Sequence, residues 1–228
     1  MSDVFTVVVI SGGASDPSTT RMLADRVTAA VAKTAQGRSR AVRFNYFEIR
    51  PLADEITAAL TARILGEGLN EAIAALADAD GIVVSTPVYN AGPSGLLLSF
   101  FQVIDDDLLI AKPVVLAATA GTARHALVVD EQMRSLFAYL RALTVPTSIF
   151  AATEDWNQSS LRTRIERAAL ELVLLMESGF ARQIRDIAWK DYRHEYGSAG
   201  SQDLEIEFDT DMMRLAAGGS LVEDEPEP

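Results

Sequence analysis

Hydroxyl side chains and glycines are concentrated in one short stretch, residues 11–20, whose sequence is SGGASDPSTT. The stretch precedes a predicted helix, so its backbone N–H groups lie at the positive end of the helix dipole and its hydroxyls add uncharged donors. Neither G-x-G-x-x-G nor G-x-x-x-x-G-K-[ST] is present, which favours one terminal phosphate over a dinucleotide or a triphosphate. An ordinary turn with Ser18 or Thr19 as N-cap is the alternative. The candidate phosphate-binding residues are Ser11, Gly12, Ser18, Thr19 and Thr20.

A second candidate loop, residues 86–95, has the sequence TPVYNAGPSG. Pro87 and Pro93 restrict the backbone, and Tyr89 offers an aromatic plane. Asn90 and the backbone amides can hydrogen-bond the edge of a planar heteroaromatic ring. The loop therefore predicts contact with a flat ligand. The candidate residues are Pro87, Val88, Tyr89 and Asn90.

A third candidate loop, TAGTARH at residues 119–125, follows an apolar run. Gly121 allows the backbone to approach a flat ligand closely. Arg124 either pairs with a cofactor phosphate or is a solvated charge. His125 either stacks on or hydrogen-bonds a ring, or makes a structural contact at a helix start. The candidate residues are Thr119, Gly121, Thr122, Arg124 and His125.

Other polar groupings predict less chemistry. Residues 154–156, Glu-Asp-Trp, either border the same crevice or form a surface loop with one anchoring aromatic, and we favour the surface loop. Three consecutive carboxylates at residues 105–107 are typical of a solvated turn, and no His or second carboxylate cluster has ligand spacing, so we expect no metal site. We find no nucleophile–base pair for acyl transfer, and the absence of cysteine excludes thiolate chemistry.

The three loops meet only if the strands before them are parallel neighbours in a sheet. Short β-branched or apolar runs predict five strands, and amphipathic stretches between them predict helices. Right-handed crossovers then give an α/β, doubly wound three-layer sandwich with a five-stranded parallel sheet, which binds ligands at the strand carboxyl ends. The long crossover at residues 50–80 predicts two helices. The predicted strands are residues 4–10, 42–49, 81–85, 114–118 and 145–150. The predicted helices are residues 19–33, 69–77 (within that crossover), 94–104, 128–143 and 159–176.

The negative charge is concentrated at the C-terminal end of the chain. The 228 residues carry a net charge of −12, of which residues 195–228 contribute ten acidic residues and one basic residue, a net of −9. We divide the chain into a domain at residues 1–195 and an acidic C-terminal arm at residues 196–228. Without a basic stripe, nucleic-acid binding is not expected. Without an export signal or a spanning segment, we expect no membrane association and a cytoplasmic location.

The loops together resemble a known family. P-x-Y-N at residues 87–90, followed by a Pro/Gly turn and an apolar helix, is similar to the isoalloxazine loop of the flavodoxin-like NAD(P)H-dependent FMN reductases, and residues 11–20 are similar to their phosphate loop. Residues 118–127 resemble an actinobacterial branch thought to serve luciferase-like flavin monooxygenases, and the likeness covers residues 4–185. One departure is Leu96-Leu97-Leu98, where many members have a lysine.

This resemblance implies FMN and NAD(P)H as cofactors and a homodimer or tetramer as the assembly. The implied reaction is hydride transfer from nicotinamide to flavin N5, which positioning achieves without a catalytic side chain. An exchangeable FMN makes the protein a reductase that supplies reduced flavin to a partner monooxygenase. The alternatives are an FMN-containing quinone or azo-compound reductase and a flavodoxin-type electron carrier without nicotinamide activity. We expect the arm to contact, in order of preference, the mate of a homodimer, the monooxygenase or its own chain.

Overall fold

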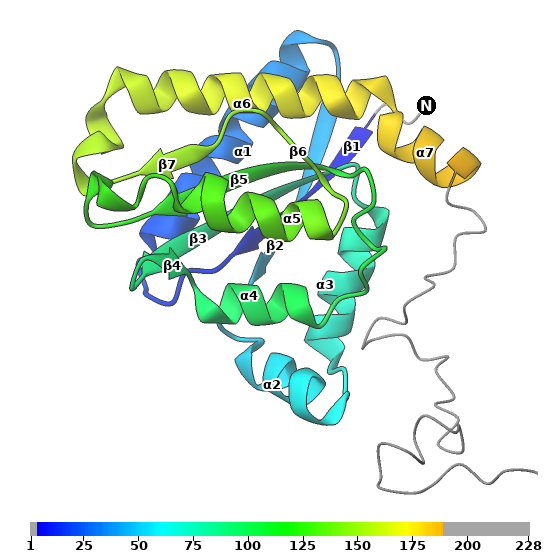
Figure 1. Ribbon diagram of the computed structural model, residues 1–228. Coiled ribbons are helices and arrows are strands. Elements are labelled where there is room, and N and C mark those ends of the chain that lie inside the picture. The colour runs from blue at the N-terminus through cyan, green and yellow to red at the C-terminus, as the bar shows by residue number, and fades with distance from the viewer. Residues whose placement is uncertain (1–3, 189–228) are drawn as a thin grey trace, which may run out of the picture.

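The computed structural model describes residues 4–188, so the predicted boundary between residues 195 and 196 and the arm lie outside the described residues. Within the described part, strands and helices alternate as predicted (Figure 1). The strands are β1 (Val4–Ser11), β2 (Ala41–Glu48), β3 (Gly81–Tyr89), β4 (Gly92–Pro93), β5 (Pro113–Thr119), β6 (Leu143–Thr144) and β7 (Ile149–Ala151). The helices are α1 (Thr19–Gly37), α2 (Ala53–Ala62), α3 (Glu67–Asp78), α4 (Gly95–Gln102), α5 (Arg134–Tyr139), α6 (Ser159–Ser178) and α7 (Phe180–Ala188), with short turns η1 (Ala123–His125), η2 (Val129–Met133) and η3 (Thr153–Asn157).

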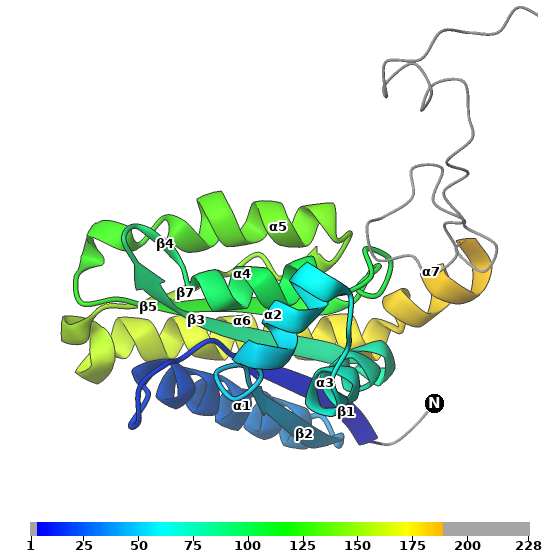
Figure 2. The same ribbon diagram turned by 90° about the horizontal axis from the view of Figure 1, so that it is seen from below.

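The sheet has the order β2-β1-β3-β5-β6, and all these neighbours pair in parallel. The central strands β3 and β5 are buried almost throughout, as parallel strands covered on both faces should be, whereas the edge strand β2 is partly exposed. One hydrophobic cluster joins the sheet to α1 and α6, and a second joins its other face to α3, α4 and α5. Figure 2 shows the resulting three layers, which confirm the predicted sandwich.

No helix in residues 4–188 is both long enough and apolar enough to cross a membrane.

The crossover between β2 and β3 contains two helices, as its length predicted. Arg63 has a positive φ of 55° and ends α2. The Glu55 side chain then accepts a hydrogen bond from the Leu69 amide at 2.7 Å and so caps the start of α3. A Cβ on Gly66 would lie 2.3 Å from that same carboxylate, so only glycine allows the chain to pass so close to Glu55.

The prediction of one continuous fifth strand at residues 145–150 was wrong. The chain instead forms two short strands, β6 and β7, which both pair in parallel with β5. Pro146 in the gap has no N–H to donate to a neighbouring strand. The Arg134 guanidinium fills this gap by donating to the carbonyl oxygens of Val145 and Pro146 at 3.1 and 3.2 Å and to Ser148 Oγ at 2.6 Å. The Arg134 side chain therefore bridges the segment between β6 and β7 with its hydrogen bonds.

The helical stretch predicted at residues 128–143 begins as expected but ends earlier, at Tyr139. Its first part, η2, is a π-helix, and the α-helical part, α5, is only six residues long. Arg141 has a positive φ of 54° and ends the helical segment. The Gln132 side chain on η2 donates to the Ala91 carbonyl oxygen at 2.8 Å and so ties this segment to the loop after β3. Wide π turns of this kind are frequent near functional sites.

Candidate functional site

A cleft of about 300 Å³ lies at the carboxyl ends of β1, β3 and β5, where the topology predicted a ligand site. Its volume is at the lower end of the range of small-molecule sites, about 300–1,000 Å³. The predicted site residues that line it are Thr19, Thr20, Pro87, Val88, Tyr89, Thr119 and Gly121. The others that line it are Gly13, Ala14, Ser15, Ala120, Thr153 and Trp156. The predicted residues outside its lining are Ser11, Gly12, Ser18, Asn90, Thr122, Arg124 and His125.

The first loop presents backbone amides to the cleft. Ser18 is the N-cap of α1, as one reading of the sequence proposed, and its Oγ accepts a hydrogen bond from the Arg21 amide at 3.2 Å. The amides of Gly13, Ala14 and Ser15 have no acceptor among the described residues. The same holds within residues 4–188 for the amides of the first two helical residues, Thr19 and Thr20. These free donors at a helix N-terminus suit a phosphate.

Ser11 and Gly12 connect this loop to the sheet. Ser11 is the last residue of β1 and is buried, and the Gly12 amide donates to the Ser85 carbonyl oxygen at 2.8 Å. Because the Gly12 amide already donates within the sheet, it is not a donor for a ligand in this structure. A Cβ on Gly12 would also meet Leu97 at 3.4 Å, so Leu97 packs next to the loop.

Hydroxyl groups join the first and third loops. The Thr20 and Thr119 Oγ1 atoms are 2.9 Å apart, and both residues are buried. The Ser85 hydroxyl donates to the Thr20 carbonyl oxygen at 2.9 Å. The start of α1 is therefore fixed against the ends of β3 and β5, which sets the distance between two walls of the cleft.

Arg21 is the cation next to this loop in sequence, but its side chain is engaged elsewhere. It pairs with Asp25 at 2.9 Å and with Glu48 at 2.8 Å, and it lies over the Tyr46 ring. Partial burial opposes the charge of Arg21, but the hydrogen bonds to the two carboxylates outweigh it and raise its pKa. No charged side chain of the described part of the chain lines the cleft, so an anion there would rely on neutral donors.

The second loop is a tight hairpin. Tyr89 pairs with Gly92 in antiparallel fashion, and between them Asn90 and Ala91 have positive φ values of 47° and 65°. Two consecutive left-handed residues are typical of a type I′ turn, in which asparagine is favoured. Asn90 therefore shapes the turn and does not line the cleft, whereas Tyr89 lines it with 51% of its surface exposed.

The third loop contributes its backbone to the cleft and not its cation. Gly121 lines the cleft, and the amides of Gly121 and Thr122 have no acceptor among the described residues. Arg124 and His125 lie in the short turn η1, one exposed and the other half-buried, beyond the lining. The structure thus places these two predicted residues at the edge of the site.

Trp156 is a lining residue that the sequence reading placed on a surface loop. It lies in η3, directly after β7, and is half-buried against the α1–α6 core. The Arg26 guanidinium lies 4.7 Å from the centre of its ring and donates to its carbonyl oxygen at 2.8 Å. Its position after the last strand was the available signal, because every strand of a parallel sheet ends at the same edge.

Among the side chains that the structure describes, no group of three or more His, Cys, Asp or Glu residues could hold a metal ion. The cleft instead combines free backbone donors on one side with Pro87, Val88, Tyr89 and Trp156 on the others. Such a site fits a flat ring that carries a single phosphate.

Comparison with known proteins identifies the family. The family model described as NADPH-dependent FMN reductase matches residues 5–157, which include all three loops. The chain belongs to this family. It is 36% identical over 180 residues to the NADH-dependent FMN reductase SfnE of Pseudomonas putida, covering 77% of this chain and 94% of that protein. It is 35% identical over 174 residues to an FMN reductase (NADPH) of Pseudomonas aeruginosa, covering 74% and 91%.

Solved structures agree on the fold. An oxidoreductase from Corynebacterium diphtheriae is 42% identical with a TM-score of 0.75, over 78% of this chain and 99% of that one. The apo form of the NADH:FMN oxidoreductase EMOB is 26% identical with a TM-score of 0.66, over 75% and 89%. A WrbA-like flavodoxin from Agrobacterium tumefaciens, at 20% identity and a TM-score of 0.50, shares the fold alone. The flavodoxin-like class and the enzyme class, an NAD(P)H-dependent FMN reductase, are confirmed, whereas the actinobacterial branch stays a prediction.

Proposed function

We propose that the protein reduces exchangeable FMN with a nicotinamide nucleotide at the cleft beside β1, β3 and β5. The observation that carries the proposal is the set of amides without a described acceptor at residues 13–15 and 19–20, which line the same cleft as Pro87–Tyr89. The phosphate binds the amides and the hydroxyls of Ser15 and Thr19. The second loop and the backbone at Gly121 would hold the flavin ring.

FMN supplies the redox chemistry, because its isoalloxazine ring accepts a hydride from nicotinamide. The protein's residues supply position and electrostatics. The free amide of Gly121, which lines the cleft, and that of Thr122 beside it would stabilise negative charge on the flavin, as fixed dipoles in a pre-organised site do. Tyr89 and Trp156 bound the ring, and no ionisable acid or base other than the Tyr89 phenol lines the cleft. Catalysis is therefore by alignment rather than by proton transfer from a carboxylate, histidine or lysine.

Arg124 and His125 serve the nicotinamide nucleotide rather than FMN in this proposal. Both lie in η1, next to Gly121 but outside the lining of the cleft. Arg124 is exposed and has no partner among the side chains that the structure describes, so its guanidinium is available to a phosphate of the second nucleotide.

Exchange of the flavin is supported by the exposure of the site. Ala14, Ser15, Tyr89 and Gly121 all line the cleft and are exposed, so no described segment closes over it. An open site favours release of reduced FMN to a second protein, and we propose a flavin-dependent monooxygenase as the acceptor. A tightly held FMN would instead favour a quinone or azo-compound reductase.

Dialysis of the purified protein against flavin-free buffer separates these cases. The proposal expects a nearly colourless protein that regains flavin absorbance when FMN is added and loses it again on gel filtration. A protein that keeps one FMN per chain through both steps would overturn the exchange proposal, although it would leave the reductase assignment in place.

A further inference from the structure

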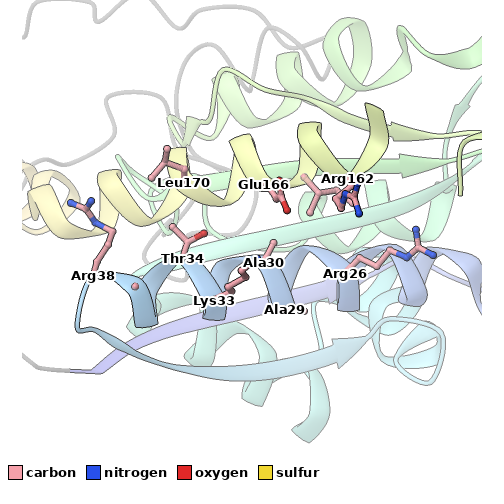
Figure 3. A pocket seen from close by; sticks show the side chains of 11 residues that line it. Arg26, Ala29, Ala30, Lys33, Thr34, Arg38, Arg162, Glu166 and Leu170 are labelled. Carbon is pink, nitrogen blue, oxygen red and sulfur yellow. The ribbon is translucent and has the colours of Figure 1, made fainter. Parts of the chain in front are cut away.

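A second cavity, far larger than the cleft, lies between α1 and α6 (Figure 3). This α1–α6 groove has a volume of about 790 Å³ and contains none of the predicted site residues. The apolar part of its lining, here called its floor, includes Ala30, Ile165 and Leu170. In Figure 3, Arg38 lies at one end of the groove, and Arg26 and Arg162 lie at the other.

The rim of the groove is cationic. Its lining includes Arg26, Lys33, Arg38 and Arg162 but only one carboxylate, Glu166. Arg38 pairs with Glu177, but among the side chains that the structure describes no carboxylate pairs with Lys33 or Arg162. An apolar floor beside these two cations suits a segment that is both apolar and acidic.

The sequence contains such a segment in the acidic arm. Residues 203–211, DLEIEFDTD, carry a carboxylate at every second position, with Leu204, Ile206 and Phe208 between the first four of them. Met212, Met213 and Leu215 extend its apolar character. The segment thus matches the groove in both charge and apolarity.

The chain length allows this segment to reach the groove. Arg38 contacts Glu177 near the end of α6 at 2.6 Å, and α7 begins three residues later at Phe180. Fourteen residues, 189–202, separate the end of α7 from Asp203. At full extension they span about 46–50 Å, whereas the groove from Arg26 to Gly37 is about 17 Å long at 1.5 Å per helical residue.

We propose that residues 203–208, which span about 17–18 Å when extended, dock in the α1–α6 groove of their own chain, with their carboxylates beside Lys33 and Arg162 and their apolar side chains on its floor. The tether places the segment near the groove at an effective concentration on the order of millimolar, which exceeds that of a second copy in dilute solution. The sequence alone ranked this occupant last, because the groove becomes visible only in the folded domain.

Zero-length carbodiimide cross-linking of the full-length protein tests the proposal. The chain has three lysines, Lys33, Lys112 and Lys190, and the Lys112 ammonium is buried against the Ala77 and Ala79 carbonyl oxygens. An equal mixture of ¹⁵N-labelled and unlabelled protein is cross-linked, digested and analysed by mass spectrometry. The expected product joins Lys33 to a carboxylate of residues 203–211, with both peptides light or both heavy.

Mixed light–heavy pairs would overturn the proposal in favour of a second copy. Absence of coupling at Lys33 while Lys190 reacts would overturn it as well. Coupling could also arise because the tether alone keeps the arm near Lys33. The variant L204S/I206S/F208S tests this, because it keeps all five carboxylates of residues 203–211 but removes the apolar side chains. We expect its Lys33 coupling to fall at least about tenfold, and unchanged coupling would contradict docking.

A charge reversal on the rim provides a matched comparison. Arg162→Glu should lower Lys33 coupling about fivefold, the upper range for one exposed ion pair. Arg167→Glu changes the same charge on an exposed position of the same helix that does not line the groove, and coupling should stay unchanged. Equal losses in the two variants would mean that the effect is general electrostatics and would overturn the groove assignment.

Discussion

Gly13→Ala should damage the phosphate loop through one specific collision. A Cβ at Gly13 would lie 2.0 Å from Ser18 Oγ, 3.1 Å from Ser18 Cβ and 3.3 Å from Thr20 Cβ. The Ser18 hydroxyl can turn away only by giving up its N-cap hydrogen bond to the Arg21 amide, which costs about 0.5–2 kcal/mol. Because the displaced loop also loses donors to a charged group, worth about 1.5–3 kcal/mol each, FMN affinity should fall at least about tenfold.

Two measurements check this reasoning. Chemical denaturation of Gly13→Ala, Ser18→Ala and the double variant should show non-additivity, because both single changes remove the same cap. Flavin titration should show that Gly13→Ala weakens FMN more than riboflavin, since riboflavin has no phosphate. Gly37→Ala, at the other end of α1, meets no atom within 4 Å and should leave FMN affinity unchanged. Additive destabilisation, or equal losses for FMN and riboflavin, would refute the assignment of this loop.

Three further changes test other parts of the account. Arg134→Leu removes the hydrogen bonds across the gap between β6 and β7 and should lower the unfolding free energy, measured in urea, by about 2–4 kcal/mol. The control Arg164→Leu, at an exposed position, should change it by less than about 0.5 kcal/mol. Similar losses in both variants would show that Arg134 does not stabilise the segment between the two strands. Arg124→Ala should raise the KM for the nicotinamide nucleotide with an unchanged melting temperature, and a lower melting temperature with unaltered kinetics would make Arg124 structural. Trp156→Ala should raise the KM for FMN while Trp156→Phe retains most of the affinity, and unaltered steady-state kinetics in both would remove Trp156 from the site.

The parts of the fold that depend on local pattern could be predicted from the sequence. β1, β3 and β5 are continuous apolar runs because both faces of the sheet are covered, and that burial is visible as β-branched composition. The Ser18 cap was likewise open to prediction, because an N-cap depends on residues only a few positions away.

The parts of the fold and of the site that depend on contacts between distant residues could not be predicted from the sequence. The fifth strand is divided because Arg134, more than ten residues upstream, bonds the carbonyl oxygens around Pro146. In the same way Trp156 reaches the cleft because Arg26 on α1 holds its ring and carbonyl oxygen. Asn90 was assigned to the ligand from its chemistry, yet its positive φ gives it a role in the hairpin turn, which residue type alone does not reveal.

Steady-state oxidation of NADH and of NADPH, with free FMN in large excess over enzyme, tests the central claim most directly. The account predicts that nicotinamide absorbance decreases over many turnovers only when flavin is present, and that FMN has a higher kcat/KM than riboflavin because the amides at residues 13–15 and 19–20 bind its phosphate. No flavin-dependent oxidation with either nucleotide would contradict the assigned function.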